Sequence, residues 1–194
     1  YQGCELWDFS LVDPDNRRPV DWAQRHTALQ EIKAAHAGQG AAACARTLLE
    51  RLHDGRIKLY LTWKVLDLRR ELDAVFRDGD YLPLRADGAR ADNVVAFARQ
   101  HGGETLLLVV PRLIERFVGE ADQLPLGEAV WGDSWLELPA EAPARWVDVL
   151  TGQTVAAAAH DAGRRLALAE VCALFPYALL RPAAAPPSNP EERA

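Results

Sequence analysis

The chain has 194 residues, of which 49% are hydrophobic, so it can bury a core and form one large domain or two small ones. Its formal net charge of -6 and sequence pI near 5.4 disfavour a nucleic-acid partner, because phosphate binding needs a basic stripe and the arginines here are interleaved with acids. The sequence has no apolar run long enough to cross a bilayer and no signal-peptide pattern, so we expect no membrane partner.

The chain opens on a turn-rich loop, residues 1–21, that gathers aromatic, carboxylate, amide and guanidinium side chains. Such groups bind sugars, because flat aromatic faces pack against pyranose rings and planar polar groups fix pairs of adjacent hydroxyls. The loop therefore favours one wall of a glycan site. Two plainer interpretations stay open. Residues 13–16 are also a good turn sequence, and Arg17 and Arg18 could simply pair with Glu5 or Asp8 at the surface.

Helical signals dominate the part of the chain before residue 80. The patterns predict helices at about 22–37, 42–53 and 56–71. Asp21 can cap the first helix, and glycines end the first two, at Gly38, Gly40 and Gly55. Apolar residues of the third helix cover a wide face, as a helix needs when it closes a barrel and carries another layer on top.

After residue 80, short β-rich runs alternate with turn residues. We expect strands at 81–85, 93–99, 105–110, 135–138, 146–150, 165–171 and 177–180. Antiparallel strands at that spacing are typical of a β-sandwich. The final residues are rich in proline, alanine and charge, so disorder is expected there. The expected organisation is a first part at 1–79, a sandwich at 80–181 and a disordered tail at 182–194.

Cysteine, histidine and serine give no sign of a metal or nucleophilic site. Cys4, Cys44 and Cys172 are widely spaced, which favours reduced thiols in a cytoplasmic protein over disulfides or zinc ligands. The five histidines share no metal-ligand spacing, and Ser10 and Ser134 lack a histidine and acid constellation. We therefore expect no metal and no cofactor.

Seven strings of this sequence resemble the α-amylase family of (β/α)8 barrels. In chain order they are YQGCE at 1–5, DPDNRRPVD at 13–21, DGRIKLYLTWKVLDLRRE at 54–71, GDYLPL at 79–84, VVAFAR at 94–99, VLTG at 149–152 and FPYALL at 175–180. The first is widespread in that family just after the eighth barrel strand. The second resembles one group within the family, the maltooligosyltrehalose synthases, and the five later strings are further matches to that group. The resemblance extends to about Arg181.

The resemblance implies a portion of a larger enzyme. Its fold would be an α+β fragment: the end of the last barrel strand with its loop and helix, a helical extension, and an antiparallel β-sandwich. The group converts the reducing-end α-1,4 linkage of a maltooligosaccharide into an α,α-1,1 linkage, a glucosylmutase reaction of the isomerase class. The implied partners are a maltooligosaccharide or α-1,4-glucan substrate and the N-terminal barrel segment of the same polypeptide.

The catalytic groups are not expected in this chain. Retaining glycosidases place two carboxyl groups about 5 Å apart across the scissile bond, and the resemblance puts them on strands before this segment. The sequence contains no methionine and opens on Tyr1, which also suggests a portion of a longer product. We expect no catalytic residue here and no glucosylmutase activity from the isolated chain.

With the resemblance, the first loop becomes a candidate substrate-binding site. The residues expected to bind substrate are Glu5, Trp7, Asp13, Asp15, Asn16, Arg17 and Arg18. A guanidinium fork can hold a carboxylate rigid and also donate to sugar oxygens. Glu5 is expected to position other groups, Trp7 to stack on a sugar or pack at the barrel rim, and Arg18 to be structural or binding.

Alternatives remain for the other tryptophans and for the function. Trp63 is expected in the core, and Trp131 and Trp135 in the core in preference to a surface sugar platform. The chain could also belong to a hydrolytic enzyme of the α-amylase family, or be a non-catalytic carbohydrate-binding or structural module.

Overall fold

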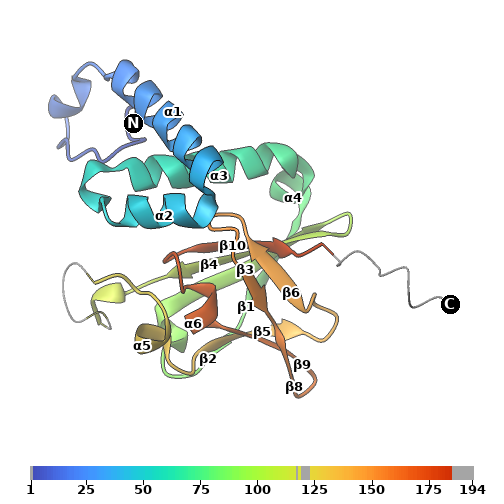
Figure 1. Ribbon diagram of the computed structural model, residues 1–194. Helices are drawn as coiled ribbons and strands as arrows, with labels where there is room; N and C mark the ends of the chain where they lie inside the picture. Colours follow the sequence, from blue (N-terminus) through green and yellow to red (C-terminus); the bar gives the residue numbers. More distant parts are fainter. Residues whose placement is uncertain (1, 117, 119–122, 185–194) are drawn as a thin grey trace.

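A layer of helices covers one face of a stack of two β-sheets in the computed structural model, which describes residues 2–116, 118 and 123–184 (Figure 1). Tyr1, the first residue of the YQGCE string, and most of the expected tail, residues 185–194, lie outside the described residues. Residues 2–21 contain turns and a short 3-10 helix, η1 (Asp15–Arg17), and no strand is found in that stretch. The end of a barrel strand at this point therefore stays a prediction.

The helices follow the expected order. They are α1 (Trp22–Gln39), α2 (Ala41–Leu49), α3 (Arg56–Glu71) and α4 (Asp73–Asp78). The expected cap is confirmed, because the Asp21 carboxylate accepts a hydrogen bond of 2.8 Å from the backbone N–H of Gln24. Gly40 then ends α1 with a φ of 85°. No described helix is both long and apolar enough to cross a membrane.

Two helical predictions need correction. The second helix does not continue to residue 53, since α2 ends at Leu49 and a separate 3-10 turn, η2 (Leu52–Asp54), leads to Gly55. Tight i to i+3 hydrogen bonds, such as Arg51 N to Leu48 O at 3.2 Å, replace the α-helical pattern there. The short helix α4 was not predicted, because six residues are too few to show a clear helical period.

The β-rich part forms a sandwich of two antiparallel sheets, as expected. The larger sheet has the strand order β1-β3-β4-β10-β6-β7 and the smaller one β2-β5-β9-β8. Their bounds are β1 Asp80–Leu84, β2 Ala86–Asp87, β3 Val94–His101, β4 Glu104–Pro111, β5 Trp135–Pro139, β6 Arg145–Asp148, β7 Thr154–Ala156, β8 Ala158–His160, β9 Gly163–Ala167 and β10 Ala178–Pro182. The two sheets share one core, in which Val109, Leu136 and Trp131 are completely buried.

Several strand predictions were wrong in detail. The run at 165–171 is a strand only to Ala167 and then becomes the helix α6 (Leu168–Val171), because a short apolar run fits a buried strand and a buried helix equally well. The strand expected at 146–150 ends at Asp148. β10 extends to Pro182, the residue expected to begin the tail. The short strands β2, β7 and β8 and the helix α5 (Glu128–Trp131) were missed.

The larger sheet is covered on both faces. One face packs on the smaller sheet, and the other packs on the helices through Leu106 and Leu179, which meet Leu68 of α3 and Val75 of α4. The Tyr60 hydroxyl of α3 donates a hydrogen bond of 2.5 Å to the carbonyl of Leu150, which joins the helices to the loop after β6. In this three-layer arrangement the helices lie between the larger sheet and the first loop, which they support.

Candidate functional site

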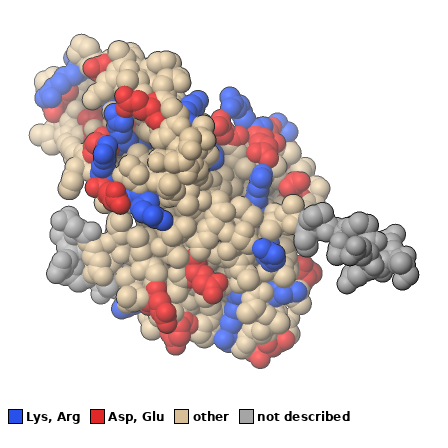
Figure 2. Space-filling model, in the orientation of Figure 1, with Lys and Arg blue, Asp and Glu red and all other residues tan. Residues whose placement is uncertain are grey.

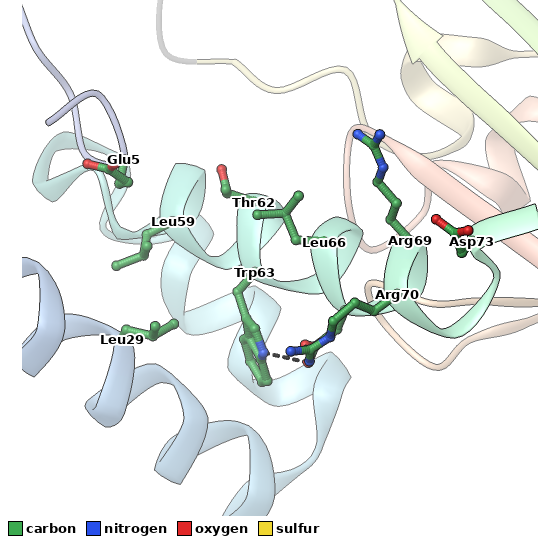
Figure 3. A pocket seen from close by; sticks show the side chains of 10 residues that line it. Glu5, Leu29, Leu59, Thr62, Trp63, Leu66, Arg69, Arg70 and Asp73 are labelled. Carbon is green, nitrogen blue, oxygen red and sulfur yellow. Dashed lines mark hydrogen bonds and ion pairs between the residues drawn. The ribbon is translucent and has the colours of Figure 1, made fainter. Parts of the chain in front are cut away.

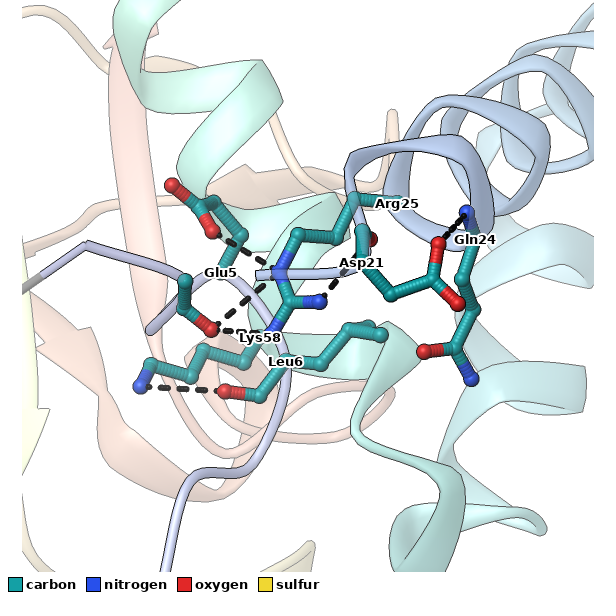
Figure 4. A network of polar contacts seen from close by, with 7 residues as sticks. Glu5, Leu6, Asp21, Gln24, Arg25 and Lys58 are labelled. Carbon is teal, nitrogen blue, oxygen red and sulfur yellow. Dashed lines mark hydrogen bonds and ion pairs between the residues drawn. The ribbon is translucent and has the colours of Figure 1, made fainter. Parts of the chain in front are cut away.

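Arg25 of α1 fixes the first part of the opening loop (Figure 4). Its guanidinium donates to the Glu5 carboxylate at 3.1 Å, to the Gly3 carbonyl through two nitrogens, and to the Asp21 carbonyl at 3.0 Å. The Arg25 side chain is only 16% exposed, so these charge-assisted bonds are shielded from much of the solvent. Arg25 therefore determines where the Glu5 carboxylate lies.

Trp7 is held at the other end of this segment. Its indole N–H donates a hydrogen bond of 2.6 Å to the carbonyl of Leu52 in η2. The ammonium of Lys58 lies 5.7 Å from the centre of the Trp7 ring and 3.5 Å from the carbonyl of Leu6. Gly55 permits this approach, because an added Cβ would lie 2.6 Å from the backbone nitrogen of Trp7. Trp7 keeps 42% of its surface exposed, so part of the ring is open to a ligand.

The other predicted binding residues lie together on an exposed turn around η1. Arg17 donates a hydrogen bond of 2.9 Å to the Asp13 carboxylate, and Arg18 forms an ion pair with Asp15. The Asp15 carboxylate also accepts a hydrogen bond of 3.0 Å from the backbone N–H of Leu11. The side chain of Asn16 is exposed. The turn thus presents carboxylate, amide and guanidinium groups in one short stretch.

The structure places the predicted residues in two groups. Glu5 and Trp7 rest on the helices, and the residues from 13 to 18 form the exposed turn. Within the described part of the chain, no hydrogen bond or ion pair links the two groups. The alternative in which Arg17 and Arg18 pair with Glu5 or Asp8 was wrong, since their partners are Asp13 and Asp15. Both arginines pair with carboxylates three or four residues earlier in the same turn, which lie closer to them than Glu5 or Asp8.

The sequence reasoning missed the residues that hold the loop. Arg25 carries a usable signal, because it lies four residues after the cap Asp21 and so shares its side of the helix. Gly55 was predicted only as a helix stop, and its second role depends on the distant contact with Trp7. Lys58 and Leu52 act across more than 40 residues of sequence, which local patterns do not reveal.

A groove of about 570 Å³ adjoins the loop and runs along α3 (Figure 3). It is lined by Glu5, Leu29, Leu59, Thr62, Trp63, Leu66, Asp67, Arg69, Arg70 and Asp73. Trp63, expected in the core, is instead half-buried at this groove, where its N–H donates a hydrogen bond of 2.7 Å to Asp67. The groove extends the candidate site from the loop onto the helix.

The two tryptophans of the sandwich differ. Trp131 is completely buried and donates a hydrogen bond of 2.8 Å to the carbonyl of Pro125, so the core prediction is confirmed. Trp135 is half-buried, and the guanidinium of Arg165 lies 3.8 Å from its ring centre. That guanidinium covers the ring face which a sugar would need.

Asp148 is the one acidic side chain in the buried class among the described residues. Its carboxylate accepts hydrogen bonds from the N–H groups of Leu150, Thr151 and Leu179 and from the Thr151 hydroxyl. Burial raises the pKa of Asp148, and these four donors oppose that shift. Through these bonds Asp148 links the end of β6 to the start of β10. Its carboxylate oxygens are already occupied and are not available to a substrate. No cluster of metal-binding side chains occurs within the residues that the structure describes.

Comparison with known proteins identifies the relatives of this chain. Two Mycobacterium tuberculosis proteins, from strains CDC 1551 and H37Rv, that carry the name maltooligosyl trehalose synthase are each 37% identical to it over 154 residues, or 79% of the chain. The structure of a mutant maltooligosyltrehalose synthase from Arthrobacter ramosus superposes on 94% of the chain with a TM-score of 0.65 and 29% identity. This chain is a homologue of maltooligosyltrehalose synthases. None of the protein-family models matches it.

The homology covers a small share of the relatives. The chain spans 15% of the length of the mycobacterial synthases and 20% of the Arthrobacter structure. The 37% identity over 79% of the chain confirms the resemblance of the sequence strings to the synthase group.

Proposed function

We propose that this chain is the C-terminal part of a cytoplasmic maltooligosyltrehalose synthase, and that its opening loop holds sugar at the catalytic site of the complete enzyme. The observation that supports the proposal most is the homology to synthases over 79% of the chain. The whole enzyme would convert the reducing-end α-1,4 linkage of a maltooligosaccharide to an α,α-1,1 linkage. The catalytic carboxylates would come from the remainder of the polypeptide.

The chemical problem in this reaction is to retain the released glucose. The covalent glycosyl-enzyme must be attacked by the anomeric hydroxyl of that glucose and not by water, so the glucose has to stay oriented while the leaving linkage breaks. Holding a reactant in position raises its effective concentration greatly, and excluding water suppresses hydrolysis. The exposed turn around η1 offers suitable groups for this purpose.

The turn can bind a sugar without a large rearrangement. Arg17 is oriented by Asp13 and Arg18 by Asp15, so each guanidinium is already partly ordered while its other N–H groups stay available. Asn16 adds an amide that can both donate and accept. The open part of the Trp7 ring offers a face for a pyranose. Glu5, fixed by Arg25, would position neighbouring groups.

The proposal is tested by the ratio of trehalosyl product to free glucose in the complete enzyme. Asp15→Ala and Arg17→Ala should each shift the products toward hydrolysis by roughly tenfold or more, since a hydrogen bond to a charged group contributes about 1.5–3 kcal/mol. Asp78→Ala is the control, because Asp78 forms an exposed ion pair with Arg77 on α4 and does not line the groove. An unchanged ratio in both loop variants would favour the plain turn interpretation.

A second measurement addresses the isolated chain. Incubated with maltopentaose, it should yield no trehalosyl product above a buffer control, because the paired carboxylates of the reaction are expected elsewhere. Free glucose as the main product of the complete enzyme would instead favour a hydrolase of the α-amylase family.

A further inference from the structure

The half-buried side chain of Lys64 has no carboxylate partner, unlike many basic side chains of this protein. Figure 2 shows basic and acidic side chains interspersed over the helices on the face in view. Many of the chain's cations form ion pairs, such as Arg56 with Glu31 and Arg77 with Asp78. Within the residues that the structure describes, Lys64 forms no ion pair. A partly desolvated amine without a counter-ion is costly, so its surroundings need an explanation.

Lys64 lines a cavity of about 360 Å³ between the helices and the larger sheet. That volume lies within the range of small-molecule sites, about 300–1,000 Å³. The polar and charged groups of the lining are His36 of α1, Lys64, Asp67 and Glu71 of α3, Asp148 at the end of β6, and Arg181 of β10. The buried thiol of Cys44 on α2 also acts on the Lys64 ammonium.

The carboxylates of this lining are already bound to other groups. Asp67 pairs with Arg70, and Glu71 pairs with Arg181 at 3.0 Å. Asp148 is occupied by the four donors described above. Among these described residues, no carboxylate lies within ion-pair distance of the amine, which leaves its nitrogen free to react.

The amine and an imidazole form a nucleophile and base pair. Nζ of Lys64 lies 3.4 Å from Nε2 of His36. Burial lowers the pKa of His36 and the charge of Lys64 lowers it further, so the ring is neutral at about pH 7 and can accept a proton. Burial also lowers the pKa of Lys64 and Arg181 acts in the same direction, while Asp67 and Asp148 oppose the shift. Desolvation and a neighbouring cation are the two conditions that activate a lysine toward carbonyl compounds.

We propose that Lys64 is a modification site for small neutral hydroxy-aldehydes, the class that includes the open-chain forms of aldoses. The amine nitrogen bonds to the aldehyde carbon, and the carbonyl electron pair moves to the oxygen. His36 relays both N–H protons to that oxygen, which leaves as water when the nitrogen lone pair forms the C=N bond. One imine forms and one water is released for each aldehyde, so no oxidant or reductant is required.

The lining favours this class of aldehyde. Asp67 and Glu71 offer oxygen acceptors for hydroxyl groups, and Arg181 offers N–H donors. An apolar aldehyde would cover these groups without giving them partners, which costs free energy. An aldehyde that carries an acid group would be repelled by the same carboxylates.

The other lysines of the chain serve as internal controls, since there are only three. Lys33 on α1 is the matched one, because its ammonium lies 5.4 Å from the centre of the Trp63 ring and that of Lys64 lies 5.5 Å from it. Within the described part of the chain, Lys33 forms no hydrogen bond through its ammonium. Lys58 on α3 donates to the carbonyl of Leu6 and serves as a second reference.

The test treats the 194-residue chain with D-glyceraldehyde and cyanoborohydride, which reduces the imine to a stable amine. Peptide mass spectrometry then measures the modification rate of each lysine. At about pH 7, Lys64 should react at least about tenfold faster than Lys33, since a positioned general base contributes about 10²–10⁴-fold in enzymes. This ratio should fall as the pH rises toward 10.5, the ordinary pKa of a lysine, because burial makes the neutral amine of Lys64 available at lower pH.

His36→Gln removes the base and keeps a polar side chain. It should slow modification of Lys64 at least about fivefold and leave Lys33 unchanged. If this variant fails to fold, the ratio in the wild type and its pH dependence still decide. Equal rates at Lys64 and Lys33, a ratio independent of pH, or an unchanged Lys64 rate in folded His36→Gln would each overturn the proposal.

A second aldehyde tests the chemical class. Glyoxylate, whose aldehyde carries a carboxylate, should show a weaker preference for Lys64 over Lys33 than glyceraldehyde does. A stronger preference for Lys64 with glyoxylate would overturn the assignment to neutral hydroxy-aldehydes. Because the readout is the mass of a peptide, the outcome is independent of the product ratios that test the sugar-binding loop.

Discussion

The sandwich and the opening loop differ in how far they bury their large apolar side chains. The core of the sandwich buries large side chains completely, as at Trp131 and Val109, and its one buried acid among the described residues, Asp148, is fully hydrogen-bonded. The opening loop exposes Phe9 and Val12 and gathers its charged groups on one turn. The sandwich thus has a completed core, whereas the loop leaves large apolar side chains uncovered.

The largest effect should follow from breaking the self-contained core. In Val109→Asp a charge replaces a completely buried side chain on β4, with no partner available in the apolar core. Such changes cost about 4 kcal/mol or more, which removes most of the stability of a domain at the lower end of the usual range of about 5–15 kcal/mol.

Urea unfolding followed by circular dichroism measures this loss. Val95→Asp is the matched control, because Val95 lies on the paired strand β3 and is 42% exposed. A Val109→Asp protein as stable as the Val95→Asp control would mean that the two sheets do not share the core described above.

A buried polar group should matter nearly as much as a buried apolar one. Asp148→Ala removes the acceptor of four hydrogen bonds and leaves three backbone N–H groups without a partner. We expect a loss of about 3–5 kcal/mol in the free energy of unfolding. Asp133→Ala, at an exposed turn of the same sandwich, should change it by less than about 0.5 kcal/mol. Equal losses in the two variants would show that Asp148 is exposed in solution.

The same carboxyl group should give a pH dependence of defined sign. Burial raises the pKa of Asp148 in the folded state above its value of 3.8, so the folded protein holds this proton more tightly than the unfolded chain. The stability of the wild type relative to Asp148→Asn should therefore be greatest below pH 3.8 and decline as the pH rises through the folded pKa. Chemical denaturation of both proteins from about pH 3 to 8 measures this difference in stability. A difference that rises with pH would show that the folded state lowers the pKa of Asp148.

The next effect tests how the helices hold the loop. Gly55→Ala places a Cβ against the backbone of Trp7 at a φ of 75°, so it combines backbone strain with a clash. A loss of about 2–3 kcal/mol is expected, together with faster proteolysis of residues 2–12. Gly102→Ala shares the positive φ, 58°, but its Cβ meets open space, so it isolates the strain. Identical losses in the two variants would argue against the Trp7 contact.

The accuracy of the sequence predictions follows the same division between the two parts. Patterns that are local in the chain were sufficient for α1, for α3 and for the cap at Asp21, because a helix satisfies its backbone within a few residues. The β-rich runs after residue 80 were sufficient to predict a β-sandwich. They gave the wrong element at Leu168–Val171, which is a buried helical turn and not a strand, and they did not reveal the short strands β7 and β8.

The candidate site was predicted only as a set of residues. The composition of the loop pointed to Asp13 through Arg18, but the sequence could not show that Glu5 belongs to a different cluster, held by Arg25. Contacts between Trp7 and Leu52, or between the loop and the α3 groove, join residues more than 40 positions apart. Such contacts depend on how the helices pack on the sheet, which local periodicity does not specify.

The smallest effect on stability is expected at the Asp13–Arg17 pair of the turn that we propose to bind sugar. The Asp13–Arg17 pair is open to solvent, with side chains 57% and 74% exposed, so a double-mutant cycle of Asp13→Asn and Arg17→Gln should give a coupling of about 0–1 kcal/mol in thermal unfolding. Added salt should reduce it further, because the charges are screened. Under the proposed function, such a weak pair would exchange its partner for a substrate hydroxyl at little cost, whereas Arg25 holds Glu5 and Gly3 and so keeps the loop in place. A coupling above about 2 kcal/mol would instead indicate that the pair stabilises the turn, and Trp7 would then be the better candidate for contact with sugar.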